Sequence, residues 1–268
     1  MIFFKHVFII KLIFLAFINF SNAETEDQKA LQISTDAYNY DKGFGDFTSD
    51  SKMTLRNKQG EETIRNFRGK TLEVDGDGDK TLFIFDSPKD VKGTATLTFT
   101  HKLDPDDQWL YLPALKRVKR ITSDNRSGSF VGSEFAYEDL GSQELEKYKD
   151  RKYLRKEACP NNNDLECHVI SRVPTEKSSG YKYQVLWLDD TPAHKVWKID
   201  YFDRKGSHLK TLFFDDYKIY LDKHWRPSVY KMINHQTGKS TDLLVQNIRF
   251  KVGLSSRDFN SKSLSRAR

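Results

Sequence analysis

The feature that constrains this chain most is a two-residue alternation of apolar and polar side chains, which recurs in about a dozen stretches between residues 51 and 250. TIRNFRGKTLEV (63–74) and KVWKIDYF (195–202) are typical, and turn-like stretches such as DRKGS (203–207) separate them. No helical pattern alternates with them, so consecutive strands should pair antiparallel. We therefore predict a mainly β chain with a few helices, folded as one domain over residues 24–268.

Helical spacing occurs clearly in one place, residues 26–40, where apolar residues recur at Ala30, Ile33, Ala37 and Tyr40. The glycines of GFGDF should end this helix. Residues 142–157 are strongly charged and could form a helix, a long hairpin arm or both, and a last short helix is possible at SSRDFNSKSL (255–264).

The first 23 residues have the pattern of a cleaved signal peptide. Lys5 and Lys11 make its start positively charged, and residues 12–20 form its short apolar stretch. Ser21 and Ala23 supply the small residues of a cleavage site. The apolar run is shorter than the ~20 residues of a membrane-spanning helix, although an uncleaved anchor is the alternative. No cysteine follows the small residues, so we expect no lipid anchor. Export of residues 24–268 is the expectation.

Cys159 and Cys167 flank the turn residues PNNND. In an oxidising compartment this spacing favours a disulfide that pins the tip of a hairpin. Two free thiols, or a metal site completed by His168, are the alternatives, although three ligands fall short of the usual four.

Charge and motifs exclude several function classes. The formal net charge is +6, and both signs are interspersed, which argues against a nucleic-acid-binding protein. SGSFVG lacks the first glycine of G-x-S-x-G, and H-E-x-x-H is absent. DGDGDK resembles the start of a calcium loop, but Lys80 replaces the required glycine, so an acidic hairpin turn is the better interpretation. We expect no enzyme, metal or cofactor.

WLYL (109–112) departs from the alternation because it is apolar on both faces, and YQVLWL and TLFF do the same. Two-faced strands in an antiparallel meander indicate a sheet that curves around an apolar interior. A closed barrel with a ligand cavity would fit, and so would a half-barrel closed by helices. The basic cluster that follows, Lys116, Arg117, Lys119 and Arg120, either contacts anionic headgroups or an acidic partner, or only keeps a sheet edge soluble.

The stretch DDQWLYLPALKRVKRI (106–121), followed by SGSFVGSEFAYEDL (127–140), resembles the signature of the outer-membrane lipoprotein-sorting protein family, which is related to the LolA/LolB periplasmic lipoprotein carriers. The first half matches at Trp109, Tyr111, Pro113, Leu115, Arg120 and Ile121. The second half matches at Gly128, Ser129, Phe130, Gly132, Ser133, Phe135, Tyr137, Glu138, Asp139 and Leu140. Val131 and Glu134 replace the commoner Met and Asp. Trp225, Pro227, Thr241, Phe259 and Leu264 fit the C-terminal layout.

The resemblance implies an incompletely closed antiparallel β-barrel with helices plugging its concave face. It also implies a monomeric periplasmic carrier of lipid or lipid-modified protein, with peripheral membrane contact and an RND-superfamily transporter as a possible partner. The expected ligand-binding residues are Trp109, Leu110, Tyr111, Leu112, Phe130, Phe135 and Tyr137. Either Trp109 or Tyr111 should lie on the concave face. In addition, SGSFVGS should be a mobile gate or a rigid connector that packs Phe130 and Phe135 into the core.

Two other functions stay open at this point. One is an accessory subunit that docks on a membrane transporter and carries no ligand. The other is a hydrolase whose site is assembled from dispersed residues.

Overall fold

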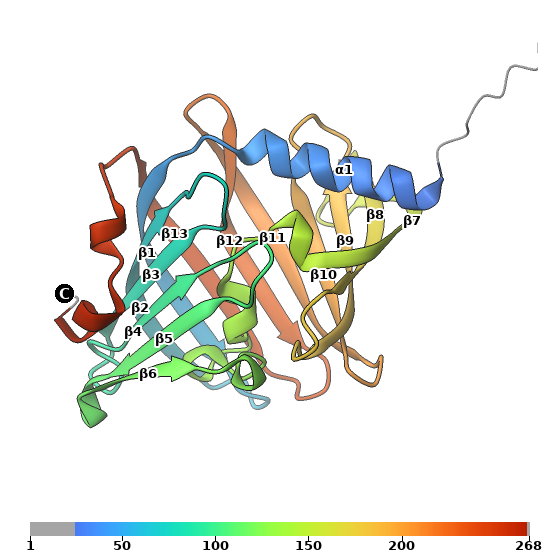
Figure 1. Cartoon of the computed structure of the whole chain (residues 1–268). Coiled ribbons are helices and arrows are strands. Elements are labelled where there is room, and N and C mark those ends of the chain that lie inside the picture. Colours follow the sequence, from blue (N-terminus) through green and yellow to red (C-terminus); the bar gives the residue numbers. More distant parts are fainter. Residues whose placement is uncertain (1–24, 267–268) are drawn as a thin grey trace, which may run out of the picture.

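The computed structural model describes residues 25–266, and one antiparallel sheet of 13 strands dominates it (Figure 1). The strand order is β6-β5-β4-β3-β2-β1-β13-β12-β11-β10-β9-β8-β7. The strands span β1 Asp46–Arg56, β2 Glu62–Leu72, β3 Lys80–Ser87, β4 Ala95–Phe99, β5 Asp107–Leu112, β6 Arg117–Ile121, β7 Tyr148–Cys159, β8 Asn162–Pro174, β9 Tyr181–Asp189, β10 Val196–Asp203, β11 His208–Tyr220, β12 His224–Asn234 and β13 Ser240–Phe250.

The sheet curls into a barrel that stays open, because β6 and β7 lie at opposite ends of the strand order and do not pair. Strands β1 to β6 pair with their sequence neighbours, and so do β7 to β13. The pairing of β1 with β13 joins these two meanders into one sheet. This confirms the predicted fold class, an incompletely closed antiparallel barrel.

A single α-helix, α1 (Glu26–Asp41), lies across one end of the barrel (Figure 1). Thr25 and Gln28 form a capping box at its start, which satisfies backbone N–H groups of the first turn. Ala30 and Ile33 are buried in the main core. The helix predicted over 26–40 is therefore confirmed within one residue.

Other helical segments are short 3₁₀ turns, so α1 is the one α-helix of the described residues. They span Pro113–Leu115, Ser123–Asn125, Phe130–Gly132, Tyr137–Leu140, Leu145–Lys147, Ser256–Asp258 and Ser261–Arg266. The charged stretch 142–157 becomes one such turn followed by β7, and the expected C-terminal helix becomes the last two turns. Two parts cover the concave face: α1, and the segment 122–147, which we call the plug.

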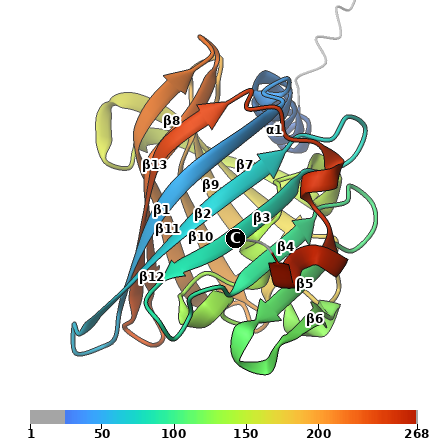
Figure 2. The ribbon, with the colours of Figure 1, turned by 90° about the vertical axis from the view of Figure 1, so that its left-hand side faces the viewer.

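The described residues form three apolar clusters, and two of them lie on opposite faces of the sheet. The main core lines the concave side, between the sheet, α1 and the plug. A second core lies on the outer face, where Phe259 and Leu264 of the C-terminal segment pack against β3, β4 and β5. Figure 2 shows this segment in front of these strands.

The disulfide prediction is confirmed: Cys159 and Cys167 are bonded at the β7–β8 hairpin, with Cα atoms 4.9 Å apart. DGDGD forms the turn between β2 and β3. The predicted signal peptide, residues 1–23, lies outside the described residues. Within residues 25–266, no helix has both the length and the apolar character needed to cross a bilayer.

Candidate functional site

The barrel encloses a cavity of about 850 Å³ between the sheet, α1 and the plug. Its apolar wall comes from both halves of the sheet and from the plug, with Met53, Phe67, Phe83, Phe130, Phe135, Ile170, Leu186, Leu188, Ile199, Leu212, Phe214, Leu243 and Val245. Strand alternation explains this wall, because residues two apart on a strand point to the same face. Leu186 and Leu188 on β9 show the pattern, since both line the cavity.

Aromatic rings close one side of the cavity. The ring of Phe130, from the plug, lies 6.2 Å from the ring of Phe83 and 5.7 Å from that of Phe85. Phe67 lies 5.0 Å from Phe85 between their ring centroids. Because Phe130 is almost fully buried, it anchors the plug in the apolar core.

The plug is also held by hydrogen bonds along the motif GSFVGSEFAYEDL. Thr241 Oγ1 accepts a bond of 3.0 Å from the backbone N–H of Glu134. The Glu134 carboxylate accepts one of 2.7 Å from Asn234. Gln108 Nε2 donates to the carbonyl of Tyr137 at 2.8 Å. These bonds come from β13, β12 and β5, so the plug is tied to both halves of the sheet.

The acidic end of the motif makes polar contacts with β9, with the residues just before β9 and with β11. The Glu138 carboxylate accepts bonds from Ser179 Oγ at 2.7 Å and from the Gly180 N–H at 2.9 Å. Burial raises the pKa of Glu138. Asp139 pairs with the buried Lys210 at 2.7 Å and accepts a bond from the Tyr181 hydroxyl at 2.7 Å. These contacts favour the rigid connector over the mobile gate, and gating stays a prediction.

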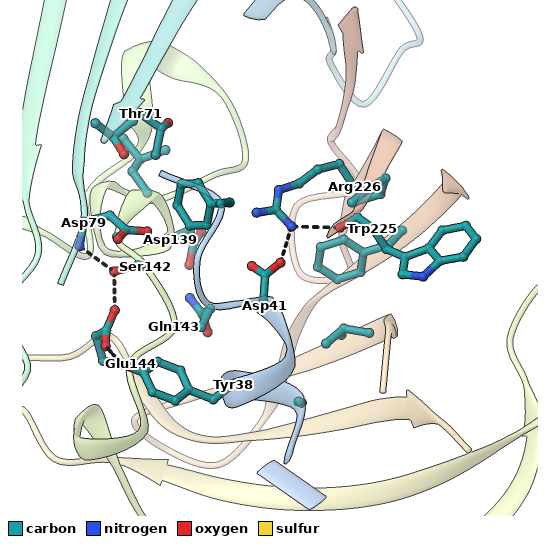
Figure 3. A pocket seen from close by; sticks show the side chains of 18 of the residues that line it. Tyr38, Asp41, Thr71, Asp79, Asp139, Ser142, Gln143, Glu144, Trp225 and Arg226 are labelled. Atoms are coloured by element: carbon teal, nitrogen blue, oxygen red, sulfur yellow. Dashed lines mark hydrogen bonds and ion pairs between the residues drawn. The ribbon is translucent and has the colours of Figure 1, made fainter. Parts of the chain in front are cut away.

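Polar side chains gather where α1 meets the rim of the barrel (Figure 3). On one side, the Tyr38 hydroxyl donates to Glu144 Oε2 at 2.7 Å, and Ser142 Oγ donates to Glu144 Oε1 at 2.7 Å. The backbone N–H of Asp79 donates to Ser142 Oγ at 3.2 Å. Burial, and then the charge of Glu144, raise the pKa of Asp79 to about 7.

On the other side of α1, Arg226 Nη1 donates to Asp41 Oδ1 at 2.5 Å. The C-terminal end of α1 is thus bonded to β12 through Asp41 and to the plug through Tyr38. The cavity therefore combines an apolar wall with a polar rim, which suits an amphiphilic ligand better than a wholly apolar one.

Of the seven expected ligand-binding residues, the structure places two in the cavity wall and five outside it. Phe130 and Phe135 line the cavity. The ring of Tyr137 packs against that of Phe130 at 5.8 Å, but Tyr137 is not part of the cavity wall. Leu110 and Leu112 share a face with Gln108, which bonds to the plug, and neither lines the cavity.

Trp109 and Tyr111 lie on the outer face, not the concave one, so the expectation for that pair is not met. They pack in the second core with Phe259 and Leu264. WLYL is apolar on both faces because the C-terminal segment covers its outer face. Whether any of the seven expected residues binds a ligand stays a prediction.

The basic cluster lies at the free edge of the sheet. Lys116 is in the turn before β6, with φ +49°, so it is not in the strand. Arg117 and Lys119 face the side of Leu112 and Leu110, to which they are paired. Arg120 is paired with Trp109 on the opposite face and forms an ion pair with Asp107. All four basic side chains are exposed.

Sequence reasoning missed the polar lining of the cavity, notably Tyr38, Glu144, Arg151, Arg172 and Arg226. These residues come from α1, the plug and three different strands. The sequence does contain one indication: Arg172 lies two residues after the apolar Ile170 on β8, so both side chains point to the inner face. Within residues 25–266, no cluster of three or more His, Cys, Asp or Glu side chains could hold a metal ion.

Comparisons with known proteins agree with this architecture. A family model described as that of an uncharacterized protein matches residues 77–266. A domain from Vibrio parahaemolyticus assigned to the outer membrane lipoprotein-sorting proteins is 51% identical. It superposes with a TM-score of 0.85, and the match covers 89% of this chain and 99% of that one. None of the curated proteins matches the chain.

Two more distant structures share the fold. A DUF1329 family protein from Desulfovibrio piger is 26% identical with a TM-score of 0.83, and the match covers 90% of this chain and 99% of that one. A LolA superfamily protein from Nitrosomonas europaea is 17% identical with a TM-score of 0.68, covering 86% and 97%. At that identity the last comparison speaks for the fold alone.

Proposed function

Because this chain belongs to the outer membrane lipoprotein-sorting protein family, we propose that it is a periplasmic carrier that holds lipid acyl chains in its cavity and passes them toward the outer membrane. The acyl chains would belong to a free lipid or to a lipid-modified protein. The carrier would bind and release its cargo without catalysing a reaction.

The observation that carries this proposal is the cavity of about 850 Å³, with its apolar wall and polar rim. Burial of an acyl chain contributes about 0.8 kcal/mol per CH₂, so a partly enclosed chain is bound without any directional contact. The rim offers hydroxyl, carboxylate and guanidinium groups to the polar end of the same molecule.

Two features support the periplasm as the place of action. The predicted signal peptide would direct export, and the disulfide between Cys159 and Cys167 fits an oxidising compartment. Residues 24–268 would then be the mature, single-domain carrier.

Filling the cavity tests the proposal. Ser51 is small, buried and part of the cavity wall, so Ser51→Phe places a ring where an acyl chain would lie. We expect the variant to fold and to bind a fluorescent fatty-acid analogue at least tenfold more weakly, since several CH₂ groups lose their space. Thr63→Phe, at an exposed position on β2, is the matched control. Undiminished binding by the folded Ser51→Phe variant contradicts a carrier role for this cavity.

A second candidate is an accessory subunit that docks on an RND-type lipid exporter. It is favoured by the unpaired edge of β6, where Lys116, Arg117, Lys119 and Arg120 are exposed. Such an edge could contact an acidic partner or anionic headgroups, but exposed cations also discourage edge-to-edge pairing.

Two pairs of substitutions at this edge give the test. Arg117→Gln with Lys119→Gln should weaken binding to anionic liposomes or to a partner, and added salt should mimic the change, because exposed charges are screened within ~8 Å at physiological ionic strength. Lys116→Gln with Arg120→Gln is the comparison. Equal, salt-insensitive binding by both variants would leave the cluster as surface only.

A further inference from the structure

Two arginines of the cavity wall lack an acidic partner. Arg151 on β7 and Arg172 on β8 both line the cavity. Among the described residues, neither has a carboxylate within ion-pair distance, whereas other buried cations of the barrel do. Lys210 with Asp139 and Arg226 with Asp41 are examples.

A β-bulge places these two side chains together. The register of β7 against β8 shifts between Lys149 and Lys152, and Asp150 adopts a left-handed backbone with φ +48°. A bulge adds one residue to a strand and re-aims the side chains that follow it. As a result Arg151 lies on the inner face, opposite Arg172.

Neutral groups hold Arg172 in place. Its Nε donates to Gln184 Oε1 at 2.9 Å, and its Nη2 donates to Gln143. The guanidinium stacks on the ring of Tyr148, 3.5 Å from the ring centroid. Arg172 is 9% exposed, so it is a buried cation whose contacts fix its direction without neutralising its charge.

Arg151 has spare donor capacity. Two of its nitrogens donate to backbone carbonyls, those of Tyr148 and Leu145. Its Nε is buried and has no hydrogen-bond partner. Burial and the neighbouring charge of Arg172 lower the pKa of Arg151, and Glu146 acts on it only from beyond ion-pair distance.

Two acidic side chains of the same cavity are already bonded to other groups. Glu144 directs its carboxylate to Tyr38 and Ser142, and Asp139 is occupied by Lys210. Burying a charge without a counter-charge is expensive, and two like charges side by side cost more. Guanidinium groups match carboxylates and phosphates in shape and charge.

We propose that Arg151 and Arg172 form the binding site for an anionic headgroup, a carboxylate or a phosphate, of an amphiphile whose chain occupies the cavity. The inference rests on the carrier function proposed above and narrows it to anionic amphiphiles. Gln143 and Tyr148 act with the arginines by orienting the guanidinium of Arg172.

Headgroup charge is the variable to test. Purified, delipidated protein is titrated with oleate, with 1-oleoyl-lysophosphatidate and with neutral monoolein, which share one acyl chain. The intact protein should bind the two anions more tightly than monoolein. Arg172→Gln and Arg151→Gln should each weaken anion binding roughly tenfold to a hundredfold, as expected for a hydrogen bond to a charged group, and leave monoolein unchanged.

Two further variants separate charge from structure. Arg155→Gln removes the same charge on β7 from an exposed side chain paired with Glu157, and should alter neither affinity. Arg172→Lys keeps the charge and should retain part of the anion preference. Circular dichroism of each variant checks folding, and the less buried Arg151→Gln keeps the test valid if Arg172→Gln unfolds.

The outcomes distinguish the two proposals. Monoolein binding without any preference for anions, in a folded protein, overturns the headgroup site and leaves the carrier intact. An equal loss of monoolein and oleate binding in Arg151→Gln also overturns it. Binding of inorganic phosphate as tight as that of 1-oleoyl-lysophosphatidate contradicts an amphiphile and indicates a free-anion site. Failure to bind all three amphiphiles refutes the carrier itself.

Discussion

Replacement of Lys210 by Met should strongly destabilise this protein. Lys210 on β11 and Asp139 in the plug form an ion pair of 2.7 Å, and each side chain is 4% exposed. Lys210 also donates to the backbone carbonyl of Glu134 at 2.9 Å. Met has a similar length without the charge, so Lys210→Met leaves the Asp139 carboxylate buried without a cation.

The magnitude follows from the cost of one unpaired buried charge. Removing one partner of a buried pair destabilises a protein by about 3–5 kcal/mol. Tyr181 and the backbone N–H of Ala136 still donate to Asp139, which favours the lower half of this range. For a domain of this size each kcal/mol shifts Tm by about 2–4 °C, so a decrease of roughly 6–16 °C is expected.

Chemical denaturation of the variant, followed by tryptophan fluorescence, measures the change in the free energy of unfolding. The double variant Lys210→Met with Asp139→Asn removes both charges, and should recover more than half of the lost stability because no buried charge remains. A loss below about 1 kcal/mol in Lys210→Met, the level of an exposed ion pair, would refute the role given to this pair.

Three further predictions concern the rim, the disulfide and the plug. The pKa of Asp79 in the folded protein, about 7, lies above its ordinary value, so ionisation of Asp79 opposes folding as pH rises. Asp79→Asn should therefore stabilise the protein in thermal unfolding, by a margin that grows from about pH 4 to pH 7. A margin that does not depend on pH contradicts this prediction. Cys159→Ala with Cys167→Ala opens a loop closed by residues 8 apart in sequence. It should lower the free energy of unfolding, measured with denaturant, by about 2.5 kcal/mol. A loss near zero would show that the hairpin needs no cross-link. Amide hydrogen exchange over residues 127–136 should be as slow as in the sheet and unchanged by oleate, whereas fast exchange that slows with oleate indicates a gate.

Much of the fold was predictable because it depends on local patterns. The alternation of side chains gave the meander, and the spacing of Ala30, Ile33 and Ala37 gave α1. The turn residues between Cys159 and Cys167 gave the hairpin and its disulfide. Each of these signals lies within a stretch of about 15 residues or fewer, so it can be interpreted without knowing any distant contact.

The face of WLYL was not predictable, because it depends on a contact with the other end of the chain. Phe259 and Leu264 cover the outer face of β5, and nothing near residue 109 indicates that. The inward position of Arg151 depends on the bulge at Asp150, which reverses the parity of β7 and leaves no mark in the pattern. The sequence therefore predicts an apolar cavity, but of the seven ligand-binding residues expected from it only Phe130 and Phe135 lie in the cavity wall.

Native mass spectrometry of the protein isolated from its own periplasm, without detergent, tests the carrier proposal most directly. We predict a mass above that of the polypeptide by one amphiphile, which dissociates on collisional activation and appears as an anion in lipid extracts. The same preparation of Ser51→Phe should show mainly the bare polypeptide, since its cavity is filled. A wild-type protein that carries no lipid, and takes up none from periplasmic extract, would contradict the account.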